Sequence, residues 1–145
     1  MKIILVGYMA SGKSTIGKLL SESLHIPFYD LDDLIETNLN LRISEIFEQK
    51  GELFFRKKER EVLENFLNTT VNYVLALGGG TPCYYDNFDL YDSSAIHSIY
   101  LKASVGTLLE RLHSQKAFRP LISHFNDEEL NEFVAKHLFE RSYFY

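Results

Sequence analysis

A segment near the start of the chain combines residue types and spacing that suit phosphate binding. Residues 7–14 read Gly-Tyr-Met-Ala-Ser-Gly-Lys-Ser and fit the pattern G-x-x-x-x-G-K-[ST]. In this pattern backbone N–H groups surround a nucleotide's phosphates, and the helix that follows adds the positive end of its dipole. The lysine reaches the β- and γ-phosphates, and the hydroxyl that follows it holds Mg²⁺. We therefore predict a nucleotide site made of Ala10, Ser11, Gly12, Lys13, Ser14 and Thr15.

The flanking residues support this interpretation of the loop. Residues 2–6, Lys-Ile-Ile-Leu-Val, read as a buried strand, and residues 15–24 read as a helix. Strand before and helix after is the context in which the pattern binds phosphate. The alternative, an ordinary Gly/Ser turn, gives no reason for a lysine between Gly12 and the start of a helix.

Two aspartates follow the second predicted strand, residues 27–29. Extended backbone has a period of two, so Asp30 and Asp32 share one side of the chain. One carboxylate can serve the Mg²⁺ shell, and the other can accept a proton from a hydroxyl or orient it for attack. The alternative is a helix N-terminus that is merely acidic, in which Asp32 or Asp33 caps the next helix. We assign capping to Asp33 and chemistry to the other two.

Three consecutive glycines, Gly78, Gly79 and Gly80, follow the third predicted strand, residues 73–77. Glycine costs backbone entropy, and a run of three suits a backbone that approaches a ligand closely rather than a flexible turn before Pro82. The third strand lacks the Mg²⁺-binding Asp that many P-loop ATPases and GTPases place there. The motifs N-K-x-D and D-x-x-G are also missing from the sequence, which disfavours a GTPase and favours a kinase for a small acceptor.

The arginines divide into surface charges and candidates for anion binding. Arg56 follows two phenylalanines in a predicted helix, Arg141 lies near the end of the last helix, and Arg119 lies in the connection of residues 114–126. Arg119 is placed like a lid residue, which on closing would exclude water and bring a guanidinium to the transferring phosphoryl group. We interpret Arg42, Arg60 and Arg111 as surface charges, although Arg111 could also flank an adenine.

The elements that must position these residues alternate along the chain. Four strands are predicted at residues 2–6, 27–29, 73–77 and 96–101, and helices at residues 14–24, 33–38, 44–49, 52–67, 105–113 and 127–143. This alternation predicts an α/β sandwich around a parallel sheet, with ligands beyond the carboxyl ends of its strands. Four strands are few for such a sheet, so we expect a final strand and helix to be absent from this stretch.

Composition limits the classes of function. The chain has 145 residues, 46% hydrophobic and 24% charged, which is typical of one globular domain. The net charge of −5 argues against a nucleic-acid surface, and no apolar run approaches the ~20 residues of a membrane span. Cys83 is the single cysteine, so no internal disulfide is possible. With no recognisable signal peptide, we expect a cytoplasmic monomer.

These motifs, taken in order, resemble the shikimate kinase family. The matching segments are residues 7–14, Asp30-Leu31-Asp32, Phe55-Arg56 with Glu59, Gly78–Gly80, Arg119-Pro120-Leu121, and Arg141 with Tyr145. The resemblance covers essentially the whole chain. It implies a P-loop kinase domain over residues 1–145, a three-layer α/β/α sandwich with strand order 2-3-1-4-5, of which the last strand is missing here. It also implies transfer of the γ-phosphoryl group of ATP to the 3-hydroxyl of shikimate with Mg²⁺.

The resemblance also assigns roles to residues. Lys13 would hold the β- and γ-phosphates, and Mg²⁺ would be held by Ser14 and, through water, by Asp30. Asp32 would bind the shikimate hydroxyl as candidate base, and Arg119 would be the lid arginine. A shikimate-binding segment would span about residues 33–62 and a lid about residues 114–126. The remaining acceptor contacts would be Arg56 and Arg141 on the carboxylate, Phe47 and Phe55 as an apolar wall, and the Gly78–Gly80 backbone on ring hydroxyls or the γ-phosphate.

One departure from the family pattern concerns Ala10, which stands where the family usually has glycine. A methyl group is tolerated there at negative φ, which we therefore expect. Two other functions remain open from the residues: a different P-loop kinase, acting on gluconate or a nucleotide, and a nucleotide-binding module without catalysis. The first does not explain the pair Arg56 and Arg141, and the second does not explain why Lys13, Asp32 and Arg119 are all present.

Overall fold

A parallel β-sheet of four strands forms the centre of the structure, a computed structural model that describes residues 1–116, 119 and 121–145. The sheet has the order β2-β3-β1-β4. Its strands are β1 (Lys2–Val6), β2 (Phe28–Asp30), β3 (Tyr73–Ala76) and β4 (His97–Tyr100). This order agrees with the first four places of the expected 2-3-1-4-5 sheet, with β4 at an edge.

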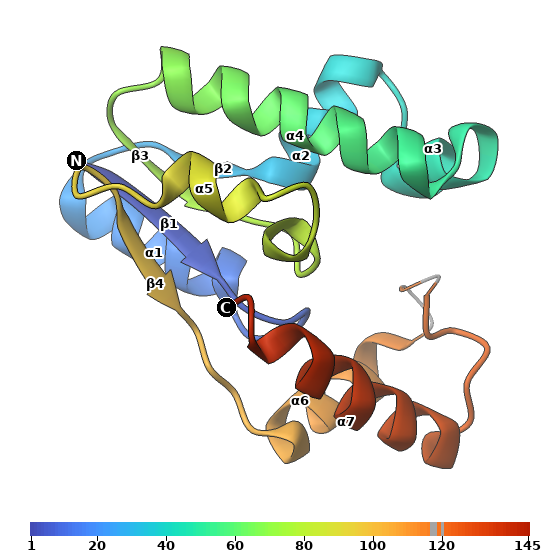
Figure 1. Cartoon of the computed structure of the whole chain (residues 1–145). Helices are drawn as coiled ribbons and strands as arrows, with labels where there is room; N and C mark the ends of the chain where they lie inside the picture. The colour runs from blue at the N-terminus through green and yellow to red at the C-terminus, as the bar shows by residue number, and fades with distance from the viewer. Residues whose placement is uncertain (117–118, 120) are drawn as a thin grey trace.

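Seven α-helices accompany the sheet in the described part of the chain. They are α1 (Lys13–Leu24), α2 (Leu31–Leu39), α3 (Ile43–Lys50), α4 (Glu52–Thr69), α5 (Asn87–Tyr91), α6 (Val105–Gln115) and α7 (Asp127–Ser142). Figure 1 shows α2, α3 and α4 together above the sheet and α6 and α7 beyond the ends of β1 and β4. The α/β architecture with helices on both sides of the sheet is therefore as predicted.

Alternation along the strands explains the layers. Ile4 and Val6 of β1 are buried in the cluster that includes α2 and α4, whereas Ile3 and Leu5 are buried in the cluster on the α1 side. Successive side chains of a strand point to opposite faces, so β1 must be apolar throughout to be covered on both. This is why residues 3–6 read as a continuous apolar run.

A third apolar cluster lies at the site end of the sheet. Tyr8, within the phosphate-loop motif, packs with residues of α6 and α7 and with Ile122 of the predicted lid. The loop is therefore covered by the last two helices of the chain. The predicted lid, residues 114–126, includes residues 117, 118 and 120, which lie outside the described residues.

Two short elements were not predicted from the sequence. A 3₁₀ turn spans Thr81–Cys83, and α5 spans Asn87–Tyr91. Both are too short to show a helical repeat of apolar residues, and their stability comes from tertiary contacts. They matter because they follow the triglycine segment, Gly78–Gly80, and place the side chains of residues 81–87 beside that segment.

Candidate active site

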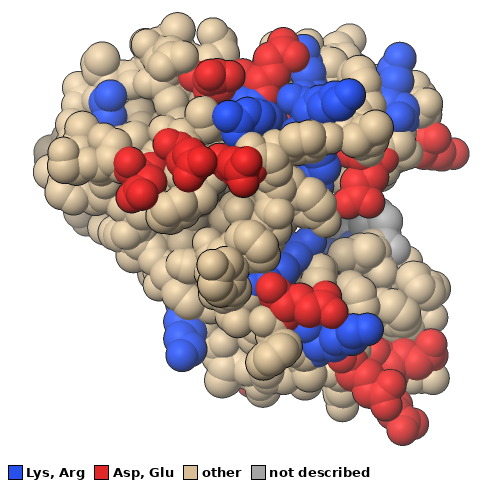
Figure 2. All heavy atoms as spheres, viewed as in Figure 1, with Lys and Arg blue, Asp and Glu red and all other residues tan. Residues whose placement is uncertain are grey.

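A cleft of ≈ 780 Å³ lies at the carboxyl ends of β1, β2 and β3. Figure 2 shows the molecule hollowed between the part that carries α3 and α4 and the part that carries α6 and α7, with both signs of charge interspersed over this face. The lining residues come from the phosphate loop, the two acids, the triglycine segment and α6. They are residues 9–16, Asp30, Asp32, Leu77, Gly78, Gly79, Arg111, Gln115 and Arg119.

The phosphate loop has the backbone that its motif predicts at the start of α1. Gly12 is the N-cap at φ 101°, a left-handed conformation that favours glycine. Ser11 Oγ is buried and has no hydrogen-bond partner among the described residues, so it is available to a phosphate oxygen. A buried, unpaired hydroxyl at a helix N-terminus fits the phosphates of a nucleotide.

Lys13 folds back over the loop. Its Nζ donates to the carbonyl oxygens of Gly7 at 2.6 Å and Tyr8 at 2.9 Å. Burial lowers the pKa of Lys13 to about 8, although the nearby Asp30 and Asp32 favour its charged form. Within the described residues Nζ donates only to neutral carbonyl oxygens, and negatively charged phosphate oxygens beside it would favour the charged form of the lysine. The environment of Lys13 therefore fits a nucleotide's phosphates.

The conformation of Ala10 differs from expectation. Its φ is +64°, in the left-handed region, and not negative as predicted from the methyl group. The loop keeps the geometry that glycine adopts easily and imposes it on alanine at an energetic cost. Arg111 Nη1 donates to the Ala10 carbonyl at 2.9 Å, so Arg111 is tied to the loop rather than being only a surface charge.

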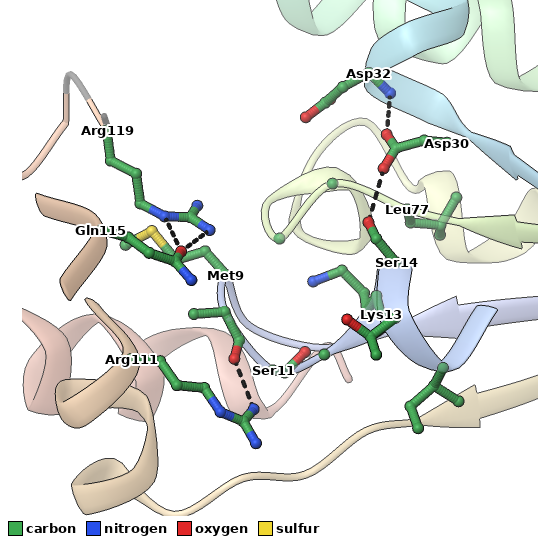
Figure 3. A pocket seen from close by; sticks show the side chains of 16 residues that line it. Met9, Ser11, Lys13, Ser14, Asp30, Asp32, Leu77, Arg111, Gln115 and Arg119 are labelled. Carbon is green, nitrogen blue, oxygen red and sulfur yellow. Dashed lines mark hydrogen bonds between the residues drawn. The ribbon is translucent and has the colours of Figure 1, made fainter. Parts of the chain in front are cut away.

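Asp30 joins the second strand to both the loop and the next helix. Its Oδ2 accepts from Ser14 Oγ at 3.3 Å, and its Oδ1 accepts from the Asp32 N–H at 2.9 Å (Figure 3). Asp30 is therefore the N-cap of α2, and the assignment of capping to Asp33 was wrong. The helix begins at Leu31, two residues earlier than predicted, because its cap is Asp30 and not Asp33.

Asp32 has the electrostatics of a proton acceptor at neutral pH. Burial, with the negative charges of Asp30 and Glu59, raises the pKa of Asp32 to about 7, and the Lys13 ammonium opposes this. A carboxyl with a pKa near the operating pH is suited to general-base catalysis. Raised values of this kind cluster at functional sites.

The donor set suits Mg²⁺ bound together with phosphates. No group of three or more His, Cys, Asp or Glu side chains that could hold a metal occurs among the described residues. Mg²⁺, however, is usually bound through one or two carboxylates, waters and substrate phosphates. The Ser14 hydroxyl and the Asp30 carboxylate, already in contact, fit that arrangement.

The two predicted clamp arginines meet at the triglycine segment. A Cβ atom placed on Gly80 would lie 2.7 Å from Arg56 Nη2 and 3.1 Å from Arg141 Nη2, so a side chain here would force these guanidinium groups to shift. Arg56 comes from α4 and Arg141 from α7, 85 positions apart in the sequence (141 − 56). Two guanidinium groups over one glycine suit a carboxylate.

Glu59 fixes Arg56 on one side. Arg56 Nη1 lies 3.0 Å from Glu59 Oε1, and Glu59 Oε2 accepts from Thr81 Oγ1 at 2.8 Å. A Cβ placed on Gly78 would lie 3.4 Å from Asp32 Oδ1. The triglycine segment thus runs from the candidate base to the arginine pair.

One face of α7, together with Tyr145 just beyond its end, contacts both loops of the site. His137, Arg141 and Tyr145 follow each other at intervals of four residues, and the Tyr145 hydroxyl donates to the Gly79 carbonyl at 2.6 Å. His137 Nδ1 lies 2.8 Å from the Tyr8 hydroxyl. Sequence reasoning missed the His137 contact, although the i, i+4 spacing to Arg141 was a usable signal.

Of the two phenylalanines predicted to form an apolar wall, only Phe55 lies beside another predicted site residue. The rings of Phe47 and Phe55 lie 4.6 Å apart, with Phe55 buried and Phe47 37% exposed. Neither lines the cleft of ≈ 780 Å³. Phe55 does lie beside the Arg56 guanidinium, at 5.1 Å from ring centroid to Cζ, so it borders the acceptor side of the site.

Arg119 reaches the cleft from the predicted lid. Gln115 Oε1 accepts from Arg119 Nε at 3.0 Å and from Nη2 at 2.7 Å, which directs the guanidinium as Figure 3 shows. Ile122, three residues on, is fully buried in the cluster with Tyr8.

A phosphate loop after the central β1 strand, two acids at the carboxyl end of β2 and arginines around the cleft define a P-loop kinase. The sequence profile described as shikimate kinase matches residues 9–145. The chain belongs to the shikimate kinase family.

Individual relatives agree with this assignment. The chain is 55% identical to a shikimate kinase of Flavobacterium psychrophilum over 144 residues, 99% of this chain and 84% of the relative. Its fold matches the crystal structure of shikimate kinase from Bacteroides thetaiotaomicron with a TM-score of 0.92 and 35% identity, over 99% of this chain and 81% of that one. The shikimate kinase from Acinetobacter baumannii, solved in complex with shikimate, matches with a TM-score of 0.82 and 34% identity, over 97% of this chain and 76% of that one.

Proposed function

We propose that the protein transfers the γ-phosphoryl group of ATP to the 3-hydroxyl of shikimate, giving ADP and shikimate 3-phosphate. The observation that carries the proposal is the convergence of Arg56 and Arg141 on Gly80, next to the phosphate loop and Asp32. An acceptor that carries both a carboxylate and a hydroxyl fits this arrangement. The shikimate bound in the Acinetobacter baumannii structure is such a molecule.

The nucleotide half of the site would act by positioning and by electrostatics. The backbone N–H groups of residues 10–15 would surround the phosphates, and Lys13 would leave the carbonyls of Gly7 and Tyr8 for the β- and γ-phosphates. Ser14 and Asp30 would hold Mg²⁺, which when bound neutralises charge on the phosphates. The hydrogen bond between these two side chains supports that assignment.

The acceptor half would hold shikimate by its carboxylate. Arg56, fixed by Glu59, and Arg141 would clamp the carboxylate, while the Gly79 and Gly80 backbone lies against the ring. Phe55 and Phe47 would border the apolar side. This placement would direct a ring hydroxyl toward Asp32, which lies at the Gly78 end of the same segment.

The proton of that hydroxyl would pass to the Asp32 carboxylate as its oxygen attacks the γ-phosphorus, and the bond from the γ-phosphorus to the β,γ-bridging oxygen would break to release ADP. The raised pKa of Asp32 makes it a stronger base than an exposed aspartate. Arg119, directed into the cleft by Gln115, would stabilise charge on the transferring phosphoryl group and help to exclude water.

The site is built from one chain, and we propose that the protein acts as a monomer. We also propose the cytoplasm as its compartment, since the single Cys83 forms no internal disulfide and suits a reducing environment. No helix in the described part of the chain has the length and apolar character that crossing a bilayer requires.

Analysis of the product tests the proposal. We expect incubation with ATP, Mg²⁺ and shikimate to yield ADP and an ester with one added phosphoryl group, which ³¹P and ¹H NMR would place on the 3-oxygen. Chelation of Mg²⁺ should stop the reaction. A phosphoryl group on another oxygen, or ADP formed with no new ester, would contradict the proposed reaction.

A further inference from the structure

The ring of Tyr84 covers the guanidinium group of Arg56. Arg56 Cζ lies 4.0 Å from the centroid of the Tyr84 ring, which is the distance of a cation–π contact. The Phe55 ring lies at 5.1 Å from the same atom. Arg56 is buried, so this contact is shielded from water and stronger than an exposed one.

The backbone after the triglycine segment places Tyr84 there. Thr81 N donates to the Gly78 carbonyl at 3.1 Å and Cys83 N to the Gly80 carbonyl at 3.0 Å, which closes the 3₁₀ turn. Tyr85 and Asp86 then both adopt left-handed backbone, with φ of 49° and 53°. Two successive left-handed residues other than glycine are unfavourable, so the surrounding structure must hold them.

Arg60 supplies that hold. Its Nη1 donates to the Tyr85 carbonyl and, at 3.3 Å, to Asn87 Oδ1. Asn87 is fully buried and its Nδ2 donates to the Thr81 carbonyl at 2.9 Å. Arg60 was predicted to be a surface charge, and these bonds correct that interpretation. It lies one helical turn after Arg56 on α4, so one helix anchors the turn and carries the arginine that the turn covers.

The Arg56 guanidinium group could also point away from Gly80, toward Glu52. Beside it lies a groove of ≈ 530 Å³ lined by Glu52, Leu53, Arg56, Cys83, Tyr84 and Tyr85. Arg56 Nε lies 3.8 Å from Glu52 Oε1, beyond hydrogen-bond distance, and this buried Nε has no hydrogen-bond partner among the described residues. Without the Tyr84 ring the guanidinium could turn toward Glu52 and leave Gly80.

We propose that Tyr84, held by the turn that Arg60 anchors, is a positioning residue that directs the Arg56 guanidinium toward the acceptor carboxylate. The proposal rests on the proposed function, in which Arg56 binds that carboxylate. Stacking leaves the edge of the guanidinium free, so Nη1 bonds to Glu59 while Nη2 faces Gly80. Tyr84 itself touches no reacting atom.

Replacement of the ring tests the proposal. We expect Tyr84→Leu to raise the KM for shikimate about 3- to 30-fold, the range of a cation–π contact, with kcat and the KM for ATP unchanged. Tyr84→Phe keeps the ring and should restore the KM to within about 2-fold of the original. Tyr143→Leu, at a tyrosine that is 89% exposed, serves as the matched control and should change nothing.

Two further measurements separate this role from general damage and from the proposed function. With the methyl ester of shikimate, which lacks the carboxylate charge, Tyr84→Leu and the original protein should have equal KM values. In the Arg56→Ala background, Tyr84→Leu should add no further increase, because the two residues act as a unit.

The outcomes distinguish the two claims. An unchanged KM for shikimate in Arg56→Ala would overturn the carboxylate clamp and with it this part of the proposed function. A raised KM in Arg56→Ala but not in Tyr84→Leu would overturn only the role of Tyr84. The role of Tyr84 would also be contradicted if Tyr84→Leu lowered kcat and raised the KM for ATP as much as it raised the KM for shikimate. The same holds if Tyr84→Phe raised the KM for shikimate as much as Tyr84→Leu.

Discussion

Asp30 Oδ1 accepts the backbone N–H of Asp32 at 2.9 Å, so the acid proposed for the metal also fixes the backbone of the proposed base. The same carboxylate caps α2 and, through Oδ2, accepts from Ser14 of the phosphate loop at 3.3 Å. One side chain thereby links the nucleotide half of the site to the acceptor half. Its charge and its capping function are separable by substitution.

Asp30→Asn should remove the charge and keep the cap, because asparagine caps helices as well as aspartate does. We expect it to raise the Mg²⁺ concentration needed for half-maximal activity while the Tm stays near that of the original protein. Asp30→Ala should show the same Mg²⁺ effect and also lose about 1 kcal/mol of stability. The two variants would be compared by Mg²⁺ titration and thermal melting. Equal stability of both variants would contradict the capping assignment.

The pH dependence should report the raised pKa of Asp32. The base must be ionised, so kcat/KM for shikimate should rise with pH through an apparent pKa near 7, not near the ordinary carboxyl value of about 4. Rate measurements from pH 5 to pH 8 at saturating ATP check this. Asp30→Asn removes one of the charges that raise the value, so it should move this limb to lower pH.

Asp32→Asn is the control for that profile. We expect a kcat lower by about 10²–10⁴ and no limb near pH 7. The folded-state pKa exceeds the unfolded value of about 3.9, so ionisation of Asp32 destabilises the fold progressively between about pH 4 and pH 7. The variant should therefore melt at a higher temperature than the original protein at pH 8. A limb near pH 7 that persists in this variant would assign the titration to another group.

Arg119→Ala should lower kcat with little change in the affinity for ATP. The guanidinium enters the cleft on the side of α6, where Gln115 orients it, and an arginine finger contributes about 10³–10⁵ to the rate. Arg42→Ala, at an exposed arginine outside the cleft, is the matched control and should have normal kinetics. If Arg119→Ala raises only the KM for shikimate, the residue binds the acceptor and does not stabilise the transferring group.

Ala10→Gly should stabilise the phosphate loop. Ala10 has a φ of +64°, and left-handed backbone costs a residue with a Cβ atom roughly 1–2 kcal/mol that glycine does not incur. Part of that gain is offset by the greater entropy of glycine in the unfolded chain, so we expect a net increase of about 0.5–1 kcal/mol in the free energy of unfolding. Urea denaturation measures it. A decrease would mean that the methyl group makes a compensating contact in the apolar cluster with Tyr8.

The parts of the site that follow strands could be predicted from the sequence because motif and position coincide. The phosphate loop, Asp30 with Asp32, and Gly78–Gly80 each lie at the carboxyl end of a strand, and parallel strands bring these ends together. The meeting of Arg56 with Arg141 was expected only from the resemblance to a family. Nothing local relates two positions that far apart in the chain.

The parts that the sequence did not predict depend on tertiary contacts. The positive φ of Ala10 follows from the path of the whole loop, and the left-handed pair Tyr85 and Asp86 is held by Arg60 on another element. Asp33 is as good a cap by residue type as Asp30, so the start of α2 could not be placed from composition alone. The contact of His137 with Tyr8 likewise depends on how α7 crosses the loop.

The selectivity of turnover for its acceptor tests the central claim most directly. ADP release with ATP and Mg²⁺ would be measured in a coupled assay against shikimate, gluconate and a nucleoside monophosphate, each at the same concentration. We predict saturable turnover with shikimate alone, and its loss in Asp32→Asn. Turnover on gluconate or the nucleoside monophosphate without turnover on shikimate would contradict the account.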